Sequence, residues 1–231
     1  MKNMASGLFF ILGAGASKDS GLSTYRGPEG LYQDLDFMEI LNVKNTCTEE
    51  GRREIWDFLL PLYNQIQAHE PGPTYDLISD LVEKEPESFI LTQNIDHYVS
   101  SIRGIPIVEI HGNNENMKCI KCKSTYKFNS TVVCPLCNLT CRPDITLFGE
   151  KLDRKRTFDT YKQCKKRFKY IIIVGTTLQF PYLRTFINKA KQRGAKVIHI
   201  NPDDEYGENV RRGERWIQAN AKEGLREMDI L

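Results

Sequence analysis

Five short apolar runs recur along this chain of 231 residues and constrain its fold more than any other feature. Each run is apolar at nearly every position, as strands covered on both faces of a parallel sheet are. Stretches with the period of a helix separate them. The expected strands cover residues 8–12, 89–92, 107–110, 170–174 and 196–200, and the expected helices cover 49–68, 73–84, 181–193 and 215–228. Strands that alternate with helices predict an α/β fold built on a parallel sheet with right-handed crossovers.

One segment, residues 117–142, interrupts this alternation because it is polar, rich in lysine and rich in cysteine. It holds two Cys-x2-Cys pairs, Cys119 with Cys122 and Cys134 with Cys137. In a reducing compartment two such pairs indicate a tetrahedral Zn²⁺, and four thiolates indicate a structural ion. We therefore predict an inserted module that zinc holds together. A redox dithiol is the weaker alternative, and Cys141 leaves open an exchange with Cys137 as the fourth ligand.

The composition is that of an ordinary globular protein, with 32 Lys+Arg against 30 Asp+Glu and a net charge of +2. This balance gives no reason to expect a nucleic acid partner, and we expect the basic stretch 151–169 to be the solvated face of a surface helix. No apolar run is long enough to cross a bilayer, and MKNMASGLFFILGAG enters a strand rather than a signal peptide. We expect a cytoplasmic protein, with the nucleus as the alternative, and no membrane partner. Its seven cysteines are then metal ligands or free thiols.

The first expected strand ends in a glycine-rich turn, 13-GAGASKDSG-21. Glycines at this position allow a tight turn and let backbone N–H groups approach a phosphate. The spelling is not GxGxxG, so the turn alone is weak evidence for a dinucleotide. The continuation 22-LSTYRGPEGLY-32 adds Thr24, Tyr25 and Arg26 in a loop that can close over a ligand. Ordinary packing of Tyr25 and a surface salt bridge of Arg26 are the alternatives.

Polar side chains follow the next two expected strands. Gln93, Asn94 and Asp96 come after the second strand, and His111 comes after the third. Ligands of open α/β sheets bind at the carboxyl ends of strands, so we expect these four side chains to share a crevice with the glycine-rich turn. An Asn and an Asp suit a carboxamide, and a histidine can take a proton from a hydroxyl. An Asn-x-Asp alone is more often a turn or helix cap, and a lone histidine is more often structural, but their joint placement favours a site.

In their order, these motifs resemble those of the sirtuins, the NAD-dependent protein deacylases. The matching pieces are GAGASKDSGLSTYRGPEGLY, LTQNID, EIHG, the two cysteine pairs, RPDITLFGE, VGTTLQF and INPDD. The resemblance implies a Rossmann-like parallel sheet with a small inserted domain made of a helical segment and a zinc ribbon. Within one catalytic domain, residues 1–231, it implies Rossmann-like parts at 1–35, 71–116 and 148–231 and small-domain parts at 36–70 and 117–147. NAD as co-substrate and an acylated-lysine protein or peptide are implied to bind between them.

The resemblance also implies a role for each matched residue. His111 is the general base, and Asn94 and Asp96 steer the nicotinamide. The residues implied to bind NAD are Gly13, Ala14, Gly15, Ser17, Thr24, Tyr25, Arg26, Gln93, Asn94, Asp96, Gly175, Thr176, Thr177 and Asn201. The segment Phe148, Gly149 and Glu150 is implied to pair with the substrate peptide as an added strand. The implied products are free lysine, nicotinamide and O-acyl-ADP-ribose.

Some positions depart from the family pattern. Thr24 is closer to the branch that removes acidic acyl groups such as succinyl. That branch uses a Tyr-x-x-Arg pair where the ungapped match places Leu59 and Leu62, so an acyl carboxylate would lack its bidentate partner. We therefore predict a neutral acyl pocket at Leu59 and Leu62, suited to acetyl or longer aliphatic groups. The segment 180-FPYLRTF-186 replaces the usual small residues after VGTTLQ, which leaves that part of the substrate track open.

The sequence thus predicts an NAD-dependent protein-lysine deacylase, most consistent with a deacetylase. An NAD glycohydrolase or protein ADP-ribosyltransferase on the same fold is the alternative, and an NAD-sensing module with weak catalysis is the third hypothesis. The FGE segment and the intact cysteine pairs favour the deacylase. The joint presence of Asn94, Asp96 and His111 argues against the sensing module.

Overall fold

The structure is a computed structural model of the chain and describes residues 5–22 and 37–228. The helices are α1 (Phe37–Ile40), α2 (Glu49–Gln67), α3 (Pro73–Lys84), α4 (Arg154–Gln163), α5 (Pro181–Lys191) and α6 (Ala221–Glu227). Short 3-10 helices are η1 (Ala14–Ser20), η3 (Val43–Cys47), η4 (Tyr98–Ser101) and η5 (Asp204–Asn209). The strands are β1 (Leu8–Leu12), β2 (Phe89–Thr92), β3 (Ile107–Glu109), β4 (Gly112–Lys118), β5 (Thr125–Lys127), β6 (Arg142–Ile145), β7 (Tyr170–Val174), β8 (Lys196–Ile200) and β9 (Arg215–Ile217). Within the described ranges, no helix combines the length and the apolar character needed to cross a membrane.

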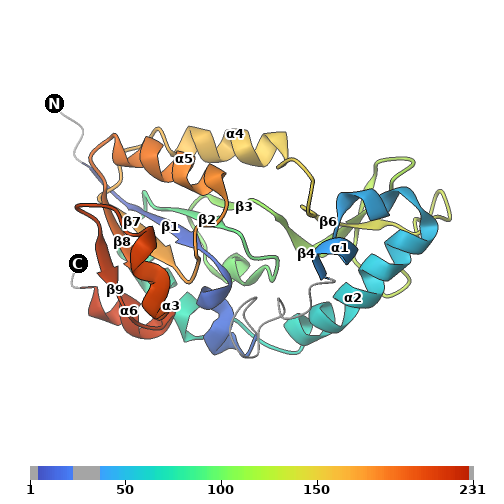
Figure 1. Cartoon of the computed structure of the whole chain (residues 1–231), viewed down its shortest axis with the longest axis horizontal. Coiled ribbons are helices and arrows are strands. Elements are labelled where there is room, and N and C mark those ends of the chain that lie inside the picture. The colour runs from blue at the N-terminus through green and yellow to red at the C-terminus, as the bar shows by residue number, and fades with distance from the viewer. Residues whose placement is uncertain (1–4, 23–36, 229–231) are drawn as a thin grey trace.

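The larger sheet has six parallel strands in the order β3-β2-β1-β7-β8-β9, which confirms the predicted Rossmann-like α/β fold. Figure 1 shows α4 and α5 on one side of this sheet and α3 and α6 on the other. Alternate residues of a strand point to opposite faces. In β1, Phe10 and Leu12 therefore join the apolar cluster that includes residues of α3 and α6, while Phe9 and Ile11 join the cluster that includes residues of α5. Both faces of the sheet are buried, as its continuous apolar runs predicted.

Most predicted elements of the large sheet agree with the structure to within a residue or two, but the helix expected at 215–228 was partly wrong. Its first part is the short strand β9, and α6 begins only at Ala221. The segment pairs in parallel with β8, and the Trp216 indole N–H donates to the Asn201 carbonyl at 3.0 Å. Sheet pairing at this edge therefore overrides the helical tendency of the first residues.

The smaller sheet is antiparallel, in the order β5-β4-β6, and α2 covers it. Trp56, Leu59 and Tyr63 of α2 are fully buried in one cluster with Met117 of β4. Two residues, Ile110 and His111, separate β3 from β4, so the chain passes from the large sheet into the small one at His111 (Figure 1). β4 begins before residue 117, where the sequence places the start of the zinc ribbon. The predicted domain boundaries stay a prediction.

Candidate functional site

The carboxyl ends of the central strands meet at one edge of the large sheet. The residue that follows each of four strands donates its backbone N–H to the last residue of a neighbouring strand. These donors are Gly13, Gln93, Ile110 and Gly175, and each N–H to O=C distance is 3.0 Å. This stepwise pairing brings residues from distant parts of the sequence to the same edge, as the position of the polar motifs predicted.

The loop after β1 and the loop after β7 touch through their backbones. A Cβ atom on Gly13 would lie 2.5 Å from Thr176 Cβ, and one on Gly15 would lie 2.6 Å from Gly175 Cα. The Gly15 N–H also donates to the Gly175 carbonyl at 2.9 Å. Glycine is thus required at 13 and 15 for the approach of the two loops, a reason that the sequence did not reveal.

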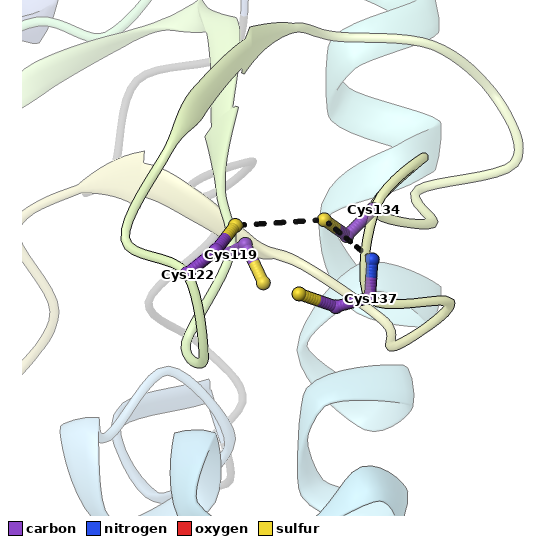
Figure 2. A group of neighbouring side chains, drawn as sticks. All are labelled: Cys119, Cys122, Cys134 and Cys137. Atoms are coloured by element: carbon purple, nitrogen blue, oxygen red, sulfur yellow. Dashed lines mark hydrogen bonds between the residues drawn. The ribbon is translucent and has the colours of Figure 1, made fainter.

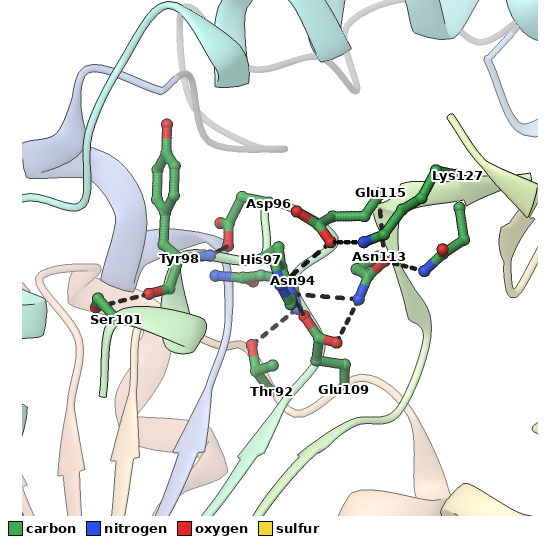
Figure 3. A network of polar contacts seen from close by, with 11 residues as sticks. Thr92, Asn94, Asp96, His97, Tyr98, Ser101, Glu109, Asn113, Glu115 and Lys127 are labelled. Atoms are coloured by element: carbon green, nitrogen blue, oxygen red, sulfur yellow. Dashed lines mark hydrogen bonds and ion pairs between the residues drawn. The ribbon is translucent and has the colours of Figure 1, made fainter. Parts of the chain in front are cut away.

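A buried polar network lies under the first loop (Figure 3 shows Asn94 and Asp96). The Asn94 side-chain amide donates to the Gly13 carbonyl at 3.1 Å and to Ser17 Oγ at 3.0 Å. Ser17 Oγ in turn donates to Asp96 Oδ2 at 2.6 Å and also lies 2.7 Å from the Tyr75 hydroxyl. Burial raises the pKa of the Asp96 carboxyl, and the hydrogen bond from Ser17 opposes this change. Ser17 therefore ties the predicted Asn94 and Asp96 to the glycine-rich turn, and Tyr75 is a member that the sequence did not predict.

One acceptor atom of this network has no donor among the described residues and is available to a ligand. Asn94 Oδ1 is buried and accepts no hydrogen bond from residues 5–22 or 37–228. A buried amide oxygen without a donor is unfavourable by about 1–3 kcal/mol, so a ligand N–H or O–H at this place would be stabilising. The unpaired acceptor of Asn94 and the close approach of the two glycine-containing loops therefore fit the NAD group that the resemblance implies. Thr24, Tyr25 and Arg26, which were predicted to act here, lie outside the described residues.

His111 is oriented from the neighbouring strand end. Its Nδ1 lies 2.9 Å from the Gln93 backbone carbonyl, which can only accept, so Nδ1 carries the proton. The Gln93 side chain donates to Thr176 Oγ1 at 2.8 Å, which links this histidine to the loop after β7. Burial lowers the pKa of His111 to about 4, and the hydrogen bond to Gln93 only partly opposes this. At neutral pH the ring is uncharged, and Nε2 presents a lone pair able to accept a proton.

The predicted adenosine side lies at the ends of β7 and β8. Gly175 has a φ of +61°, and its N–H donates to the Ile200 carbonyl. Asn201 follows β8, and its Oδ1 accepts from the Asp203 N–H at 3.0 Å. The structure thus places Gly175, Thr176 and Asn201 at the end of adjacent strands, with Thr177 next in the same loop.

The predicted substrate residues lie beside the small sheet and α2. The Phe148 N–H donates to the Leu41 carbonyl, and the Phe148 carbonyl accepts from Val43, both at 2.9 Å. Phe148 is thus already paired with the 41–43 segment, and an added peptide strand would need the backbone of Gly149 or Glu150. The Glu150 carboxylate is held by Arg142 through two hydrogen bonds of 2.7 and 2.9 Å. The peptide track stays a prediction.

Leu59 and Leu62, the predicted acyl-pocket residues, differ in their surroundings. Leu59 is 1% exposed and belongs to the core of the small sheet. Leu62 is partly buried and packs against both this core and one apolar cluster of the large sheet. Leu62 is therefore the better placed of the two to meet a ligand between the sheets.

The four predicted cysteine ligands converge in the small sheet. The thiols of Cys119, Cys122, Cys134 and Cys137 all lie within 4.8 Å of one another, and Figure 2 shows their sulfur atoms facing a common centre. Backbone N–H groups of Lys121 and Cys137 lie 3.4 Å from sulfur atoms, as donors to thiolates do. Cys141 is not in the cluster, and burial raises the pKa of its thiol to about 12. The structure brings the four predicted cysteines together in a group that could hold a zinc ion, and Cys141 lies outside that group.

A second histidine lies near the site without having been predicted. His97 follows Asp96 directly, adopts a φ of +64° and lies with its Nδ1 2.7 Å from Glu109 Oε1 (Figure 3). Its Nε2 lies 3.7 Å from Glu115, which also pairs with Lys127. The hydrogen bond to Glu109 raises the pKa of His97. No local pattern in the sequence predicts this cluster, because its members come from three strands and a turn.

Fold and site together define a nucleotide-binding α/β protein with a thiolate-held metal module. The chain belongs to the Sir2 family, since the Sir2 family model matches residues 13–181. It is 30% identical over 222 residues to the NAD-dependent protein deacylase 2 of Pseudomonas aeruginosa, with 86% of this chain and 82% of the relative covered. It is 30% identical over 201 residues to the NAD-dependent protein deacylase of Leptospira interrogans, with 84% and 80% covered. The sirtuin resemblance is confirmed.

Solved structures share the fold at lower identity. A Sir2 complex with a deacetylated p53 peptide and 3'-O-acetyl ADP-ribose superposes with a TM-score of 0.82 at 22% identity, covering 97% of this chain and 92% of that one. A structure described under the mechanism and regulation of Sir2 enzymes gives a TM-score of 0.80 at 24% identity, covering 96% and 91%.

Proposed function

We propose that this chain is an NAD-dependent protein-lysine deacylase that prefers a neutral acyl group, acetyl first. The observation that carries the proposal is an uncharged His111 that the Gln93 carbonyl orients, at the same sheet edge as the buried, unpaired Oδ1 of Asn94 and the glycine-rich turn after β1. The relatives named NAD-dependent protein deacylase support it, as do Sir2 structures with a p53 peptide and NAD. When bound, NAD supplies the ADP-ribose that accepts the acyl group and the nicotinamide that leaves.

The surroundings of each residue determine its role in the proposed reaction. Asn94 Oδ1 and the Asp96 carboxylate offer acceptors to a ligand amide, and Ser17 holds both in place. His111 accepts a proton at Nε2 because the Gln93 carbonyl fixes its tautomer and burial keeps it neutral. A general base of this kind contributes about 10²–10⁴-fold to a rate.

The choice of acyl group rests on charge. The chain has no arginine between Arg53 and Arg103, so α2 offers no guanidinium to a succinyl carboxylate. Leu62, at the boundary of the two apolar clusters, suits a methyl or a longer alkyl group. We also propose a reducing location such as the cytoplasm, because thiols that bind zinc must stay reduced.

Mass spectrometry of a reaction with NAD and a peptide panel tests this function. The panel carries acetyl-, succinyl- or long-chain acyl-lysine, with the unmodified peptide as control. We expect deacylated peptide together with O-acyl-ADP-ribose from the acetyl peptide, and little of either from the succinyl peptide. Consumption of NAD to free ADP-ribose at the same rate with every peptide would instead identify a glycohydrolase. Preference for the succinyl peptide would refute the neutral acyl pocket but not the deacylase function.

A further inference from the structure

A tyrosine that follows the loop after β7 contacts the base directly. Tyr182 lies in the first turn of α5, immediately after Pro181, which begins the helix. Its hydroxyl is 2.6 Å from His111 Nε2. The two residues are far apart in the sequence, and the departure of 180-FPYLRTF-186 from the family pattern is where this tyrosine enters.

The direction of this hydrogen bond follows from the other side of the ring. Because His111 Nδ1 donates its proton to the Gln93 carbonyl and the ring is uncharged, Nε2 can only accept. The Tyr182 hydroxyl is therefore the donor. The only lone pair with which His111 can take a proton is already occupied, so a substrate hydroxyl cannot reach it while Tyr182 stays in place.

The Tyr182 ring is held by other aromatic rings. Phe180 stacks on it with centroids 5.7 Å apart and planes at 16°, and Phe186 meets it at 6.0 Å. The His111 ring stands edge-on to it at 6.0 Å and to Phe180 at 5.6 Å. Such pairs contribute about 0.5–1.5 kcal/mol each beyond burial, so rotating Tyr182 away from His111 is unfavourable. The ring is therefore expected to stay beside the base when a ligand binds.

We propose, on the basis of the proposed function, that Tyr182 relays the proton to His111. A substrate hydroxyl donates its proton to the Tyr182 oxygen, and Tyr182 passes its own phenolic proton to His111 Nε2. One O–H bond breaks at the substrate and one forms at Tyr182, while the former Tyr182 proton forms the N–H bond of the imidazolium. The phenol ends as it began, neutral, and the substrate oxygen carries the negative charge.

Two further observations fit a relay. The Tyr182 oxygen makes its one hydrogen bond within residues 5–22 and 37–228 as a donor, which leaves its acceptor positions for a substrate hydroxyl. Burial also raises the pKa of Tyr182, so the group remains a phenol that can both donate and accept. The competing role is a cap, in which Tyr182 blocks the base and must move aside.

The variant Tyr182→Phe separates the two roles because it keeps the ring and removes the hydroxyl. Two rates are measured on the wild type and the variant in the presence of acetyl peptide: exchange of labelled nicotinamide into NAD, and deacetylation of the peptide. A relay predicts that deacetylation falls by about 10–100-fold, part of the range for general acid–base catalysis, while the exchange of labelled nicotinamide into NAD is retained. A variant that deacetylates as fast as the wild type, or faster, overturns the relay and supports the cap.

A readout without substrate tests the contact itself. Donation by Tyr182 stabilises the uncharged imidazole, so its removal should raise the pKa of His111. We would follow the His111 ring by NMR across pH in the ligand-free protein. Tyr161→Phe is the matched control, since Tyr161 packs on Phe186 at 5.0 Å without a hydrogen bond to His111. An unchanged His111 pKa in Tyr182→Phe would refute the contact on which the relay depends.

The outcomes also distinguish the relay from the proposed function. A wild-type protein that consumes no NAD with any acyl peptide would refute the function, and the relay with it. An active wild type combined with an equally active Tyr182→Phe would refute the relay and leave the function standing.

Discussion

The two histidines on either side of β3 have opposite surroundings. His97 lies before this strand, with its Nδ1 2.7 Å from the Glu109 carboxylate, and the bond to Glu109 raises its pKa. His111 lies after the strand, with its Nδ1 2.9 Å from the Gln93 carbonyl, and burial lowers its pKa to about 4. His97 directly follows Asp96 in the sequence, whereas His111 comes after the next strand, and their surroundings decide which of them can act as a base.

The two histidines differ because their hydrogen-bond partners affect the charged imidazolium form differently. A carboxylate stabilises the imidazolium, so His97, which lies between Glu109 and Glu115, holds its proton more tightly than an isolated histidine does. A backbone carbonyl fixes the tautomer without supplying a negative charge, and burial of His111 removes water from the charged form. The first arrangement builds an ion pair, and the second leaves Nε2 as an acceptor, to which the Tyr182 hydroxyl donates. We therefore expect His97 to stabilise the fold and His111 to take part in the reaction.

Removal of zinc should have the largest effect and should separate the two histidines. Glu115 lies on β4 and Lys127 on β5, so the pair between His97 and Glu115 depends on the small sheet, whereas Glu109 lies on β3 of the large sheet. Structural zinc contributes about 10–16 kcal/mol in small zinc modules, so chelation should unfold this sheet. By NMR, the pKa of His97 should then fall in part, because Glu115 is lost and Glu109 is retained, while the pKa of His111, which the large sheet positions, should change less.

The variant Cys134→Ser is the genetic counterpart, and Cys47→Ser is its control because Cys47 is an exposed free thiol. If wild-type protein loses its zinc but keeps the small sheet folded and the pKa of His97 unchanged, the assigned role of the metal is contradicted.

The two histidines should also differ in their contribution to the rate of deacylation, which is the second largest effect expected. His111→Ala should reduce deacylation by about 10²–10⁴-fold, since it removes the general base, while His97→Ala should leave most of the rate. Both variants are compared by the initial rate of deacetylation at saturating NAD, after circular dichroism has shown that they are folded. A loss in His97→Ala that equals the loss in His111→Ala would contradict this difference between the two histidines.

The sequence predicts the base better than it predicts the surroundings of the base. Five of the six strands of the large sheet follow from apolar runs, and the four cysteines follow from spacing, which are local patterns. His111 was assigned from its place after a strand and from the resemblance, and the structure puts it at the shared edge. Its contact with Tyr182 joins residues 71 positions apart, and no local pattern reports such a pair.

The same limit explains the other misses. His97 acquires its role from Glu109 and Glu115, and its φ of +64° shows a backbone conformation that its residue type does not suggest. β9 exists because β8 is beside it, although residues 215–217 continue into a helical pattern. Local periodicity predicts what a segment buries, whereas hydrogen-bond partners depend on the finished fold.

The free energy of unfolding at acid pH should reflect the lowered pKa of His111. Since the folded protein holds this ring neutral to about pH 4 while the unfolded chain protonates near the ordinary value of 6.5, stability is lost as the pH falls between these values. The difference corresponds to about 3 kcal/mol, from about 1.4 kcal/mol per pKa unit. Urea unfolding at pH 7 and pH 4.5 should therefore show a smaller acid loss in His111→Phe than in the wild type. An equal loss in both proteins would contradict the burial of a neutral ring.

His97 should give the smallest effect, with the opposite sign. Its pKa is raised in the folded state, so its contribution is complete below the unfolded value of 6.5 and is lost as the pH rises through the folded pKa. Partly exposed ion pairs contribute about 0.2–1 kcal/mol, and this is the size expected here. Urea unfolding of the wild type and His97→Gln between pH 5.5 and 8.5 isolates the effect, because the variant retains the other titrating groups. The wild type should gain stability over the variant on the acid side of this window. If the gain appears on the alkaline side instead, the carboxylates do not hold His97 as a cation, and the contrast between the two histidines fails.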